Sequence, residues 1–370
     1  MNKLLLLAGK GLSGINQPII SELQKKWSVV ANIDPFYYPF YKKIENALLS
    51  FSMNKYLWKI RYHEERAFQQ RTSKAFLNRS RICQSSIDNL AKEYDLIFQL
   101  MSTFSPLHIN ANKPYIIYVD RTQKIAEKYF PILFNRMSVS EKKELHKLVT
   151  NAFQMATKIF TFNDETKISI INDYGINSKK VFSVGFGVNL NPYPEVLKTK
   201  TKKVVSVISD FERHSGRLCI ETIKLVQQQN PTIEFVLIGQ IDSNIQDELK
   251  GKVDFIPNIP HNKLLDYYLD SMILLAPAII GSSQSLTEAM AFKCVCVGNA
   301  ENPDARNIIT DGLNGVLVEG NTPEVFSKKI LELIDSTNLV SIGESAHLHI
   351  KNNHTWENVI DKMNIEINNV

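Results

Sequence analysis

Glycines with the spacing G-x-G-x-x-G follow the first apolar run of the chain. Gly9, Gly11 and Gly14 come directly after KLLLLA, and Asp34 ends a second apolar run, WSVVANID. Such a turn lets backbone N–H groups approach a phosphate, and an acidic residue about 20 positions later can bind a ribose diol. The pattern is compatible with a nicotinamide dinucleotide site. Any strand, turn and helix that meet a phosphate need the same glycines, however, and Asp34 would then only end its strand.

A second candidate anion site lies in the segment SQSLTEAMAFKCVCV, residues 283–297. Ser285 can cap a helix that begins at Leu286 and carries Glu288 in its first turn. The N–H groups at the start of such a helix bind anions. Glu288 could accept two hydrogen bonds from a ribose diol or could complement the helix dipole, and the sequence leaves both roles open.

Strand-like runs alternate with helical patterns along the chain, which predicts the α/β class, with helices on both faces of parallel sheets. The stretch NLNPYPEVLKTKTKK, residues 189–203, has no periodicity and is typical of a linker. We therefore expect two doubly wound domains, over residues 1–192 and 202–350.

The 370-residue chain has the composition of a globular protein. Hydrophobic residues make up 44% of it, and its formal net charge is +5. No apolar run approaches the roughly 18 residues of a membrane span, and the first run is too short for a signal peptide. We expect a cytoplasmic protein. The cysteines have no C-x-x-C spacing, which argues against a metal site or a disulfide framework; they are Cys83, Cys219, Cys294 and Cys296. Cys294 and Cys296 alternate in a strand-like run and should point into a core.

Residues 40–82 form a basic segment with ten Lys and Arg against three Glu, interspersed with aromatic residues. Such a segment is compatible with peripheral contact to anionic lipid at the inner membrane surface. The alternative is a solvated helix face that covers its own core. No nucleic-acid-binding motif accompanies the charge, so no nucleic acid partner is expected.

Most of the chain resembles the retaining glycosyltransferases of family 4, which have the GT-B fold. Four blocks carry the resemblance, at residues 156–189, 209–223, 286–318 and 354–363. The third, LTEAMAFKCVCVGNAENPDARNIITDGLNGVLV, is similar to the long lEAMA.G.PVv pattern of the family. The resemblance implies two Rossmann-like domains facing an interdomain cleft, with an acceptor domain first and a donor domain second. The C-terminal helix, residues 355–370, would cross back to the first domain.

The resemblance also implies transfer of a sugar from a nucleoside diphosphate donor to a glycan, a polysaccharide or a lipid-linked acceptor. UDP is the expected nucleotide, with UDP-glucose as one candidate donor. Retention would follow if the leaving phosphate accepts the proton of the attacking hydroxyl. The sequence shows no D-x-D-like acidic pair, so neither a metal nor another cofactor is expected.

Roles for individual residues follow from the resemblance. Glu288 falls on the second glutamate of the E-x7-E motif, which holds the nucleotide ribose. The amides of Ser285, Leu286 and Thr287 would hold the donor diphosphate. Arg213 and His214 fall on an Arg-Lys pair that neutralises its charge.

The glycine loop of the first domain, with Ser13 and Gly14, would lie over the same diphosphate. The backbone around Asn258 to His261, Ile259 included, could hold the base.

Two positions depart from the family pattern. Ile280 stands where the first motif glutamate contacts the donor sugar, so Gly281, Ser282, Ser283 or Gln284 takes over that contact or activity is lost. His214 stands where a lysine is usual, which makes the charge there depend on pH.

Asp120 is the candidate acceptor-side residue, because it follows the strand YIIYV at the edge where open α/β sheets bind ligands. A helix cap or a salt bridge is the alternative. Three classes of function remain: a glycosyltransferase, a GT-B-like binding protein without turnover, and a nicotinamide oxidoreductase.

Overall fold

The computed structural model describes residues 2–9, 16–36, 39–131, 134–196 and 201–368, and its chain divides into two compact units. Unit 1 comprises Met1–Gly185 and Ile360–Val370, and unit 2 comprises Phe186–Val359. Unit 1 therefore contains the two ends of the chain, and it ends before the Pro-rich stretch that the sequence analysis interpreted as a linker. Within the described residues no helix is both long and apolar enough to cross a bilayer.

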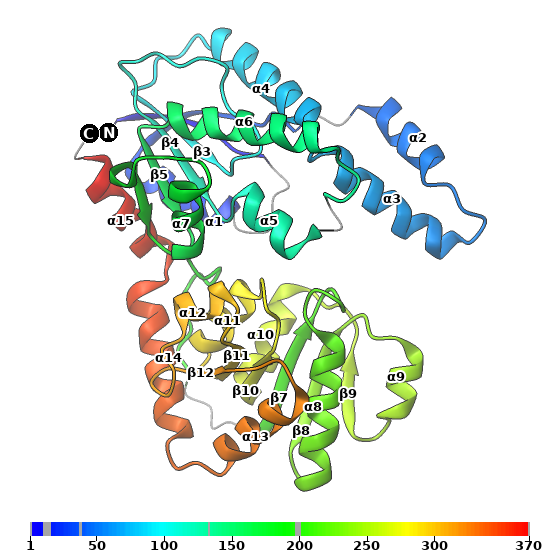
Figure 1. Ribbon diagram of the computed structural model, residues 1–370. Coiled ribbons are helices and arrows are strands. Elements are labelled where there is room, and N and C mark those ends of the chain that lie inside the picture. The colour runs from blue at the N-terminus through cyan, green and yellow to red at the C-terminus, as the bar shows by residue number, and fades with distance from the viewer. Residues whose placement is uncertain (1, 10–15, 37–38, 132–133, 197–200, 369–370) are drawn as a thin grey trace. The chain divides into compact units, whose positions relative to one another are not determined.

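Unit 1 contains a parallel six-stranded sheet in the order β2-β1-β3-β4-β5-β6 (Figure 1). Its strands are β1 (Lys3–Leu7), β2 (Ser28–Ile33), β3 (Leu96–Leu100), β4 (Tyr115–Val119), β5 (Lys158–Thr161) and β6 (Val181–Ser183). Its helices are α1 (Asn16–Lys26), α2 (Phe40–Leu49), α3 (Lys55–Gln69), α4 (Ser73–Asp88), α5 (Gln123–Tyr129), α6 (Val139–Met155), α7 (Asp164–Asn172) and the 3₁₀ turn η2 (Ser178–Lys180).

Both faces of this sheet are covered, which explains why its central strands are mostly apolar. Every residue of β3 and β4 is buried. One set of alternate side chains, with Ile97 and Ile117, packs against α4 and α6. The sequence could show this arrangement because a strand buried on both faces has no polar side.

Unit 2 repeats the architecture with a parallel sheet in the order β12-β11-β10-β7-β8-β9. Its strands are β7 (Thr201–Ile208), β8 (Glu234–Gly239), β9 (Val253–Ile256), β10 (Ser271–Ala276), β11 (Val295–Asn299) and β12 (Val316–Val318). Its helices are α8 (Gly216–Gln229), α9 (Ser243–Glu248), α10 (His261–Asp270), α11 (Ser283–Ala291), α12 (Pro303–Ile308), α13 (Pro323–Ile334) and α14 (Leu339–Asn353). Cys294 and Cys296 are fully buried, as the alternation predicted.

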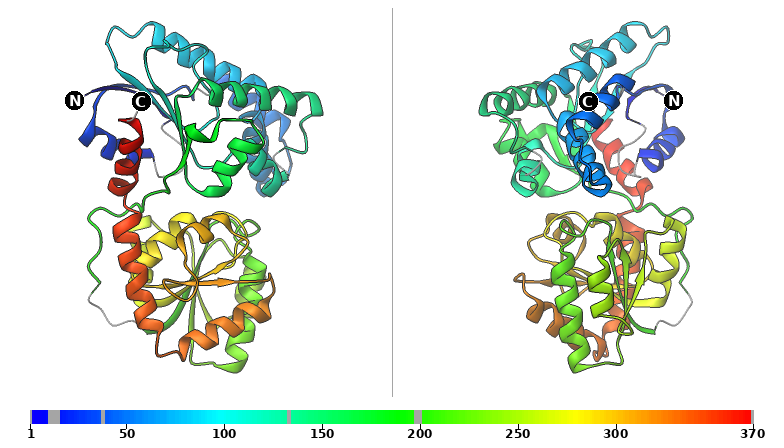
Figure 2. Two further views of the ribbon diagram at one scale, coloured as in Figure 1. Left: turned by 60° about the vertical axis from the view of Figure 1, so that its left-hand side comes forward. Right: turned by 90° about the vertical axis from the view of Figure 1, so that its right-hand side faces the viewer.

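The last helix, α15 (Trp356–Ile367), begins in unit 2 and ends in unit 1. At its start, the Trp356 indole Nε1 donates to the Asn189 side chain at 2.9 Å. At its other end, Asp361 pairs with Lys26 of α1, and Glu366 lies 3.7 Å from Lys158 of β5. The C-terminal turns of α15, in red, lie among the elements of unit 1 (Figure 2).

The turn after β1 is where the glycine pattern begins. A Cβ atom on Gly9 would lie 2.4 Å from the Phe36 ring, so only glycine fits there. Asp34 accepts a hydrogen bond from the Phe36 N–H group at 3.0 Å. This local turn contact agrees with the alternative in which Asp34 only ends its strand. Gly11, Ser13 and Gly14 lie outside the described residues.

Candidate functional site

The strand order of unit 2 places a topological switch point between β10 and β7. The chain runs outward from β7 through β8 to β9 and then continues at β10 on the other side of β7. In open α/β sheets, ligands bind beside such a point at the carboxyl ends of the strands. The segment after β7 carries Arg213 and His214, and the segment after β10 leads into α11 and Glu288.

The start of α11 differs from the prediction. The helix begins at Ser283, preceded by Gly281 and Ser282 with φ values of 79° and 68°. Ser285 is therefore inside the helix and does not cap it. The Leu286 N–H group donates to the Ser282 carbonyl at 2.9 Å, so the prediction of free amides at Leu286 and Thr287 is wrong. Their side chains are also buried.

The helix pattern leaves the amides of Ser283, Gln284 and Ser285 without an intrahelical acceptor. These three N–H groups carry the positive end of the helix dipole and could bind a diphosphate. The helix start that the sequence predicted to bind an anion is thus present, and its amides without an intrahelical acceptor lie two residues nearer the N-terminus than predicted. The shift arises because two left-handed residues turn the chain before Ser283.

Hydrogen bonds from polar side chains stabilise the loop before α11. Asn302 donates to the Ala278 and Gly281 carbonyls at 2.9 and 3.0 Å, and its side-chain oxygen caps α12. The Ser283 hydroxyl donates to Asp304 at 2.6 Å. The Ile280 side chain is 5% exposed and has no polar group, so only the backbone can form a hydrogen bond to a ligand at that position.

The Gln284 side chain is also hydrogen-bonded within unit 2, because its nitrogen donates to the Gly187 carbonyl at 3.3 Å. Its side-chain oxygen is buried and accepts no hydrogen bond from a described residue. Of the four residues predicted to replace the missing glutamate, Ser283 and Gln284 therefore have side chains bonded to partners within unit 2.

Glu288 is 3% exposed, and its Oε1 atom is hydrogen-bonded to His261 Nε2 at 2.8 Å. The bond to Glu288 raises the pKa of the His261 imidazole. His261 is the first residue of α10, directly after the loop with Asn258 and Ile259, of which Asn258 is exposed and Ile259 half-buried. The loop predicted to hold the base thus adjoins the carboxylate predicted to hold the ribose.

Arg213 and His214 follow β7 in a turn that Asp210 organises. The Asp210 carboxylate accepts from the Arg213 backbone N–H at 3.0 Å and lies 3.9 Å from its guanidinium. Burial, followed by the charge of Arg213, lowers the pKa of His214 to about 4. His214 is therefore neutral near pH 7, and Arg213 alone of the pair carries charge.

In unit 1, Asp120 follows β4 as predicted, but its carboxylate is engaged locally. It accepts from the Arg121 backbone N–H at 2.7 Å and lies 3.1 Å from the Arg121 guanidinium. Of the alternatives, the salt bridge is the one observed, since Thr122 caps α5.

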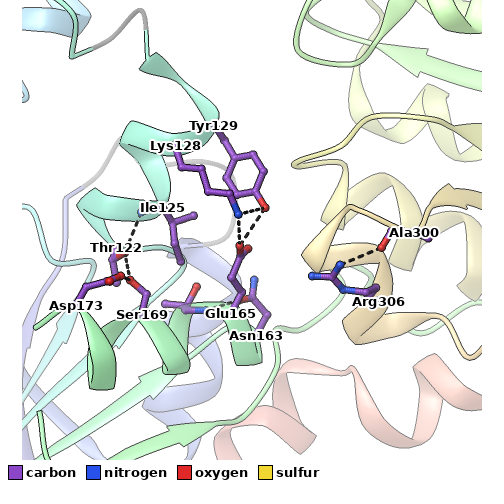
Figure 3. A network of polar contacts seen from close by, with 11 residues as sticks. Thr122, Ile125, Lys128, Tyr129, Asn163, Glu165, Ser169, Asp173, Ala300 and Arg306 are labelled. Carbon is purple, nitrogen blue, oxygen red and sulfur yellow. Dashed lines mark hydrogen bonds and ion pairs between the residues drawn. The ribbon is translucent and has the colours of Figure 1, made fainter. Parts of the chain in front are cut away.

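Around this turn, polar contacts join α5 to α7. Thr122 contacts Ser169, which donates to Asp173, while Lys128 and Tyr129 both donate to Glu165 (Figure 3).

Two side chains of the unit 2 site were not predicted. His261 was named only for its backbone, at the end of the loop predicted to hold the base, and not for its side-chain contact with Glu288. Asn302 had the signal of an Asn before a Pro at a helix start. Within the described ranges, no group of three or more His, Cys, Asp or Glu side chains is arranged to hold a metal ion.

The sequence of unit 2 matches a known family. Residues 193–354 match the model described as glycosyl transferases group 1. An uncharacterized glycosyltransferase of Methanocaldococcus jannaschii is 37% identical over 109 residues, which cover 29% of this chain and 26% of the relative. The chain thus aligns with about a quarter of the length of that curated relative.

Solved structures share the fold of the whole chain. Sucrose-phosphate synthase from Thermosynechococcus elongatus superposes with a TM-score of 0.68 at 14% identity, covering 100% of this chain and 99% of that one. The Anabaena protein HepE, solved with UDP and glucose, gives a TM-score of 0.64 at 13% identity and covers 100% of both chains. The fold of this chain is GT-B, with two Rossmann-like units.

Proposed function

We propose that this chain, in which residues 193–354 belong to the glycosyl transferases group 1 family, is a glycosyltransferase with a nucleoside diphosphate sugar as donor. The observation that carries the proposal is the buried carboxylate of Glu288 in the helix whose first amides are free, beside the switch point of the unit 2 sheet. Amides at a helix start suit a diphosphate, and a carboxylate suits the two hydroxyls of a ribose.

Charge develops on the donor diphosphate as its bond to the anomeric carbon breaks. The amides of Ser283 to Ser285 and the guanidinium of Arg213 would stabilise this charge. Because protein groups supply the positive field, we expect transfer without a divalent cation. The acceptor hydroxyl would attack from the face that the diphosphate leaves, and a diphosphate oxygen would take its proton. Retention then needs no carboxylate nucleophile of the glycosidase kind.

UDP is the nucleotide we propose, with UDP-glucose as a first donor to test. The support comes from the family match and from HepE, whose structure holds UDP and glucose. The nicotinamide alternative loses its main support, because the Asp34 carboxylate accepts from the backbone of its own turn.

Calorimetric titration with UDP, UDP-glucose, GDP and NAD in the presence of EDTA tests the proposal. We expect UDP to bind, and Glu288→Gln to weaken binding by about 1 to 3 kcal/mol through loss of charged hydrogen bonds. Glu332→Gln is the matched control, since Glu332 lies on the exposed face of α13. Binding of NAD alone would overturn the proposal. UDP binding without donor hydrolysis or transfer would identify a binding protein, with Ile280 as the reason.

The acceptor we propose is a glycan or polysaccharide intermediate linked to lipid, reached at the inner membrane surface from the cytoplasm. Helices α2 and α3 support this, because they project from unit 1 as an arm with large apolar side chains in water (Figure 1). Phe40, Leu48 and Met53 are 73%, 71% and 96% exposed. The same arm carries Lys42, Lys43, Lys55, Lys59 and Arg61. Apolar side chains flanked by cations suit an anionic bilayer surface.

A further inference from the structure

Arg79, on α4, is a buried cation without a carboxylate partner among the described residues. It is 7% exposed. Its Nε and Nη2 atoms donate to the Thr103 carbonyl at 3.1 and 2.8 Å, and its guanidinium lies 5.1 Å from the centre of the Phe36 ring. Arg79 belongs to the basic segment 40–82, which the sequence predicted to be a surface. Its burial contradicts that prediction for this residue.

A purely structural role would not need this charge. Ser80 and Gln84 of the same helix already bind the backbone of Ser105, Leu107 and His108. Those neutral side chains hold the loop after β3 at no cost in buried charge. A buried cation is costly unless an anion compensates it, so Arg79 points to an anion that binds beside it.

Two further arginines of unit 1 interact with Arg79 through their charges, Arg71 directly and Arg121 through Arg71. Arg71 lies between α3 and α4 and donates to the Ala67 carbonyl at 2.6 Å, and Arg121 follows β4. Burial lowers the pKa of Arg71, and the charge of Arg121 lowers it further. Burial also lowers the pKa of Arg79 to about 10, with a second contribution from the charge of Arg71. The charge of Arg71 thus acts on Arg79, and the charge of Arg121 acts on Arg71, while Asp120 lies 3.1 Å from the Arg121 guanidinium.

The cluster lies where a parallel sheet binds ligands. The order β2-β1-β3 makes the gap between β1 and β3 the switch point of the unit 1 sheet. Thr103 lies in the loop after β3, Phe36 follows β2 and Arg121 follows β4, all at carboxyl ends of strands. Ligands of open α/β sheets bind at this edge.

We propose that Arg71, Arg79 and Arg121 form an oxyanion site that binds a phosphate or carboxylate group of the sugar acceptor. A guanidinium presents five N–H donors in a planar fork, which matches both groups. The Nε and Nη2 atoms of Arg79 donate to the Thr103 carbonyl, and its Nη1 atom makes no hydrogen bond to a described residue. Asp120 then positions the guanidinium of Arg121. The acceptor role rests on the proposed function, whereas the anion site can be measured without it.

The test uses the full chain with UDP present in excess, so that the amides of α11 are occupied. Inorganic phosphate, glycerol phosphate and glucuronate are titrated into wild type, Arg71→Gln, Arg79→Lys and Arg81→Gln. Arg81 is the matched control because it lies on the exposed side of the same helix. We expect Arg71→Gln and Arg79→Lys to weaken anion binding about tenfold to a hundredfold, as for a lost charged hydrogen bond, and Arg81→Gln to leave it unchanged.

Tightest binding of glycerol phosphate would assign a phosphorylated acceptor, and tightest binding of glucuronate an acidic sugar. Absence of binding to wild type at millimolar concentration would overturn the proposal, and so would equal binding to wild type and Arg71→Gln. Arg71 is only partly buried, so thermal unfolding should show that Arg71→Gln still folds even if Arg79→Lys does not. Failure of UDP to bind would instead count against the proposed function.

Discussion

His261 and Glu288 are hydrogen-bonded at 2.8 Å although they belong to different helices, α10 and α11, which precede and follow β10 in the chain. The bond raises the pKa of His261. We expect Glu288→Gln to lower this pKa, as measured by the NMR titration of the His261 ring protons. An unchanged titration would show that the pair does not form in solution.

The same pair has a consequence for stability. A histidine with a raised pKa in the folded state stabilises the fold fully below its unfolded value of about 6.5, and the effect is lost as the pH rises through the folded value. The difference in unfolding free energy between wild type and Glu288→Gln should therefore shrink as the pH rises from about 6.5 through the folded pKa of His261. Denaturant unfolding at a series of pH values measures it.

His214 should act as a neutral group in donor binding. Its pKa is lowered to about 4, mainly by burial, so it gains its charge only in strong acid. We expect His214→Gln to leave UDP affinity within about 0.5 kcal/mol, and Arg213→Gln to reduce it by about 1.5 to 3 kcal/mol. Calorimetry near pH 7 compares them. A larger loss for His214→Gln than for Arg213→Gln would reverse this assignment.

The lowered pKa of His214 also makes the fold sensitive to acid. The unfolded chain binds the proton more readily, so the stability that His214 supports is present above pH about 6.5 and falls as the pH drops towards about 4. Thermal melting of His214→Gln should show a smaller loss between these values than wild type.

Asn302 should be important for stability as well as for the site. It caps α12 and donates to two carbonyls of the loop before α11. Asn302→Ala should cost about 2 to 4 kcal/mol of unfolding free energy, the sum of a lost cap and unsatisfied buried groups. Asn338 is the matched control, because it precedes α14 without a side-chain capping bond. Equal denaturant midpoints for both variants would contradict the expectation.

The arm of α2 and α3 should bind anionic vesicles. Co-sedimentation with vesicles of phosphatidylglycerol is expected to decrease in the double variant Leu48→Ser, Met53→Ser and at high salt, since apolar insertion and charge both contribute. Val340→Ser is the control, because Val340 is 69% exposed on α14. Binding to uncharged phosphatidylcholine that equals binding to phosphatidylglycerol would argue against the role of the lysines.

The sequence predicted the two parallel sheets and the segment around Glu288, because apolar runs and a capping pattern are local signals. It placed the start of α11 three residues too late, since Ser285 has the chemistry of a cap while the turn depends on Gly281 and Ser282. The contact between His261 and Glu288 depends on the packing of two helices, which no local pattern records. Arg79 lay on the helical face of Phe76 and Cys83, but its charge favoured a surface interpretation.

The division of α15 between the units affects the order in which the chain can fold during synthesis. All of unit 2 has been made once Val359 has left the ribosome, whereas unit 1 still lacks its last eleven residues, Ile360–Val370. Asp361 and Glu366, which pair with Lys26 and Lys158, are in that final segment. The unit that is translated first is therefore the one completed last, and Lys26 of α1 and Lys158 of β5 gain these partners only at that stage.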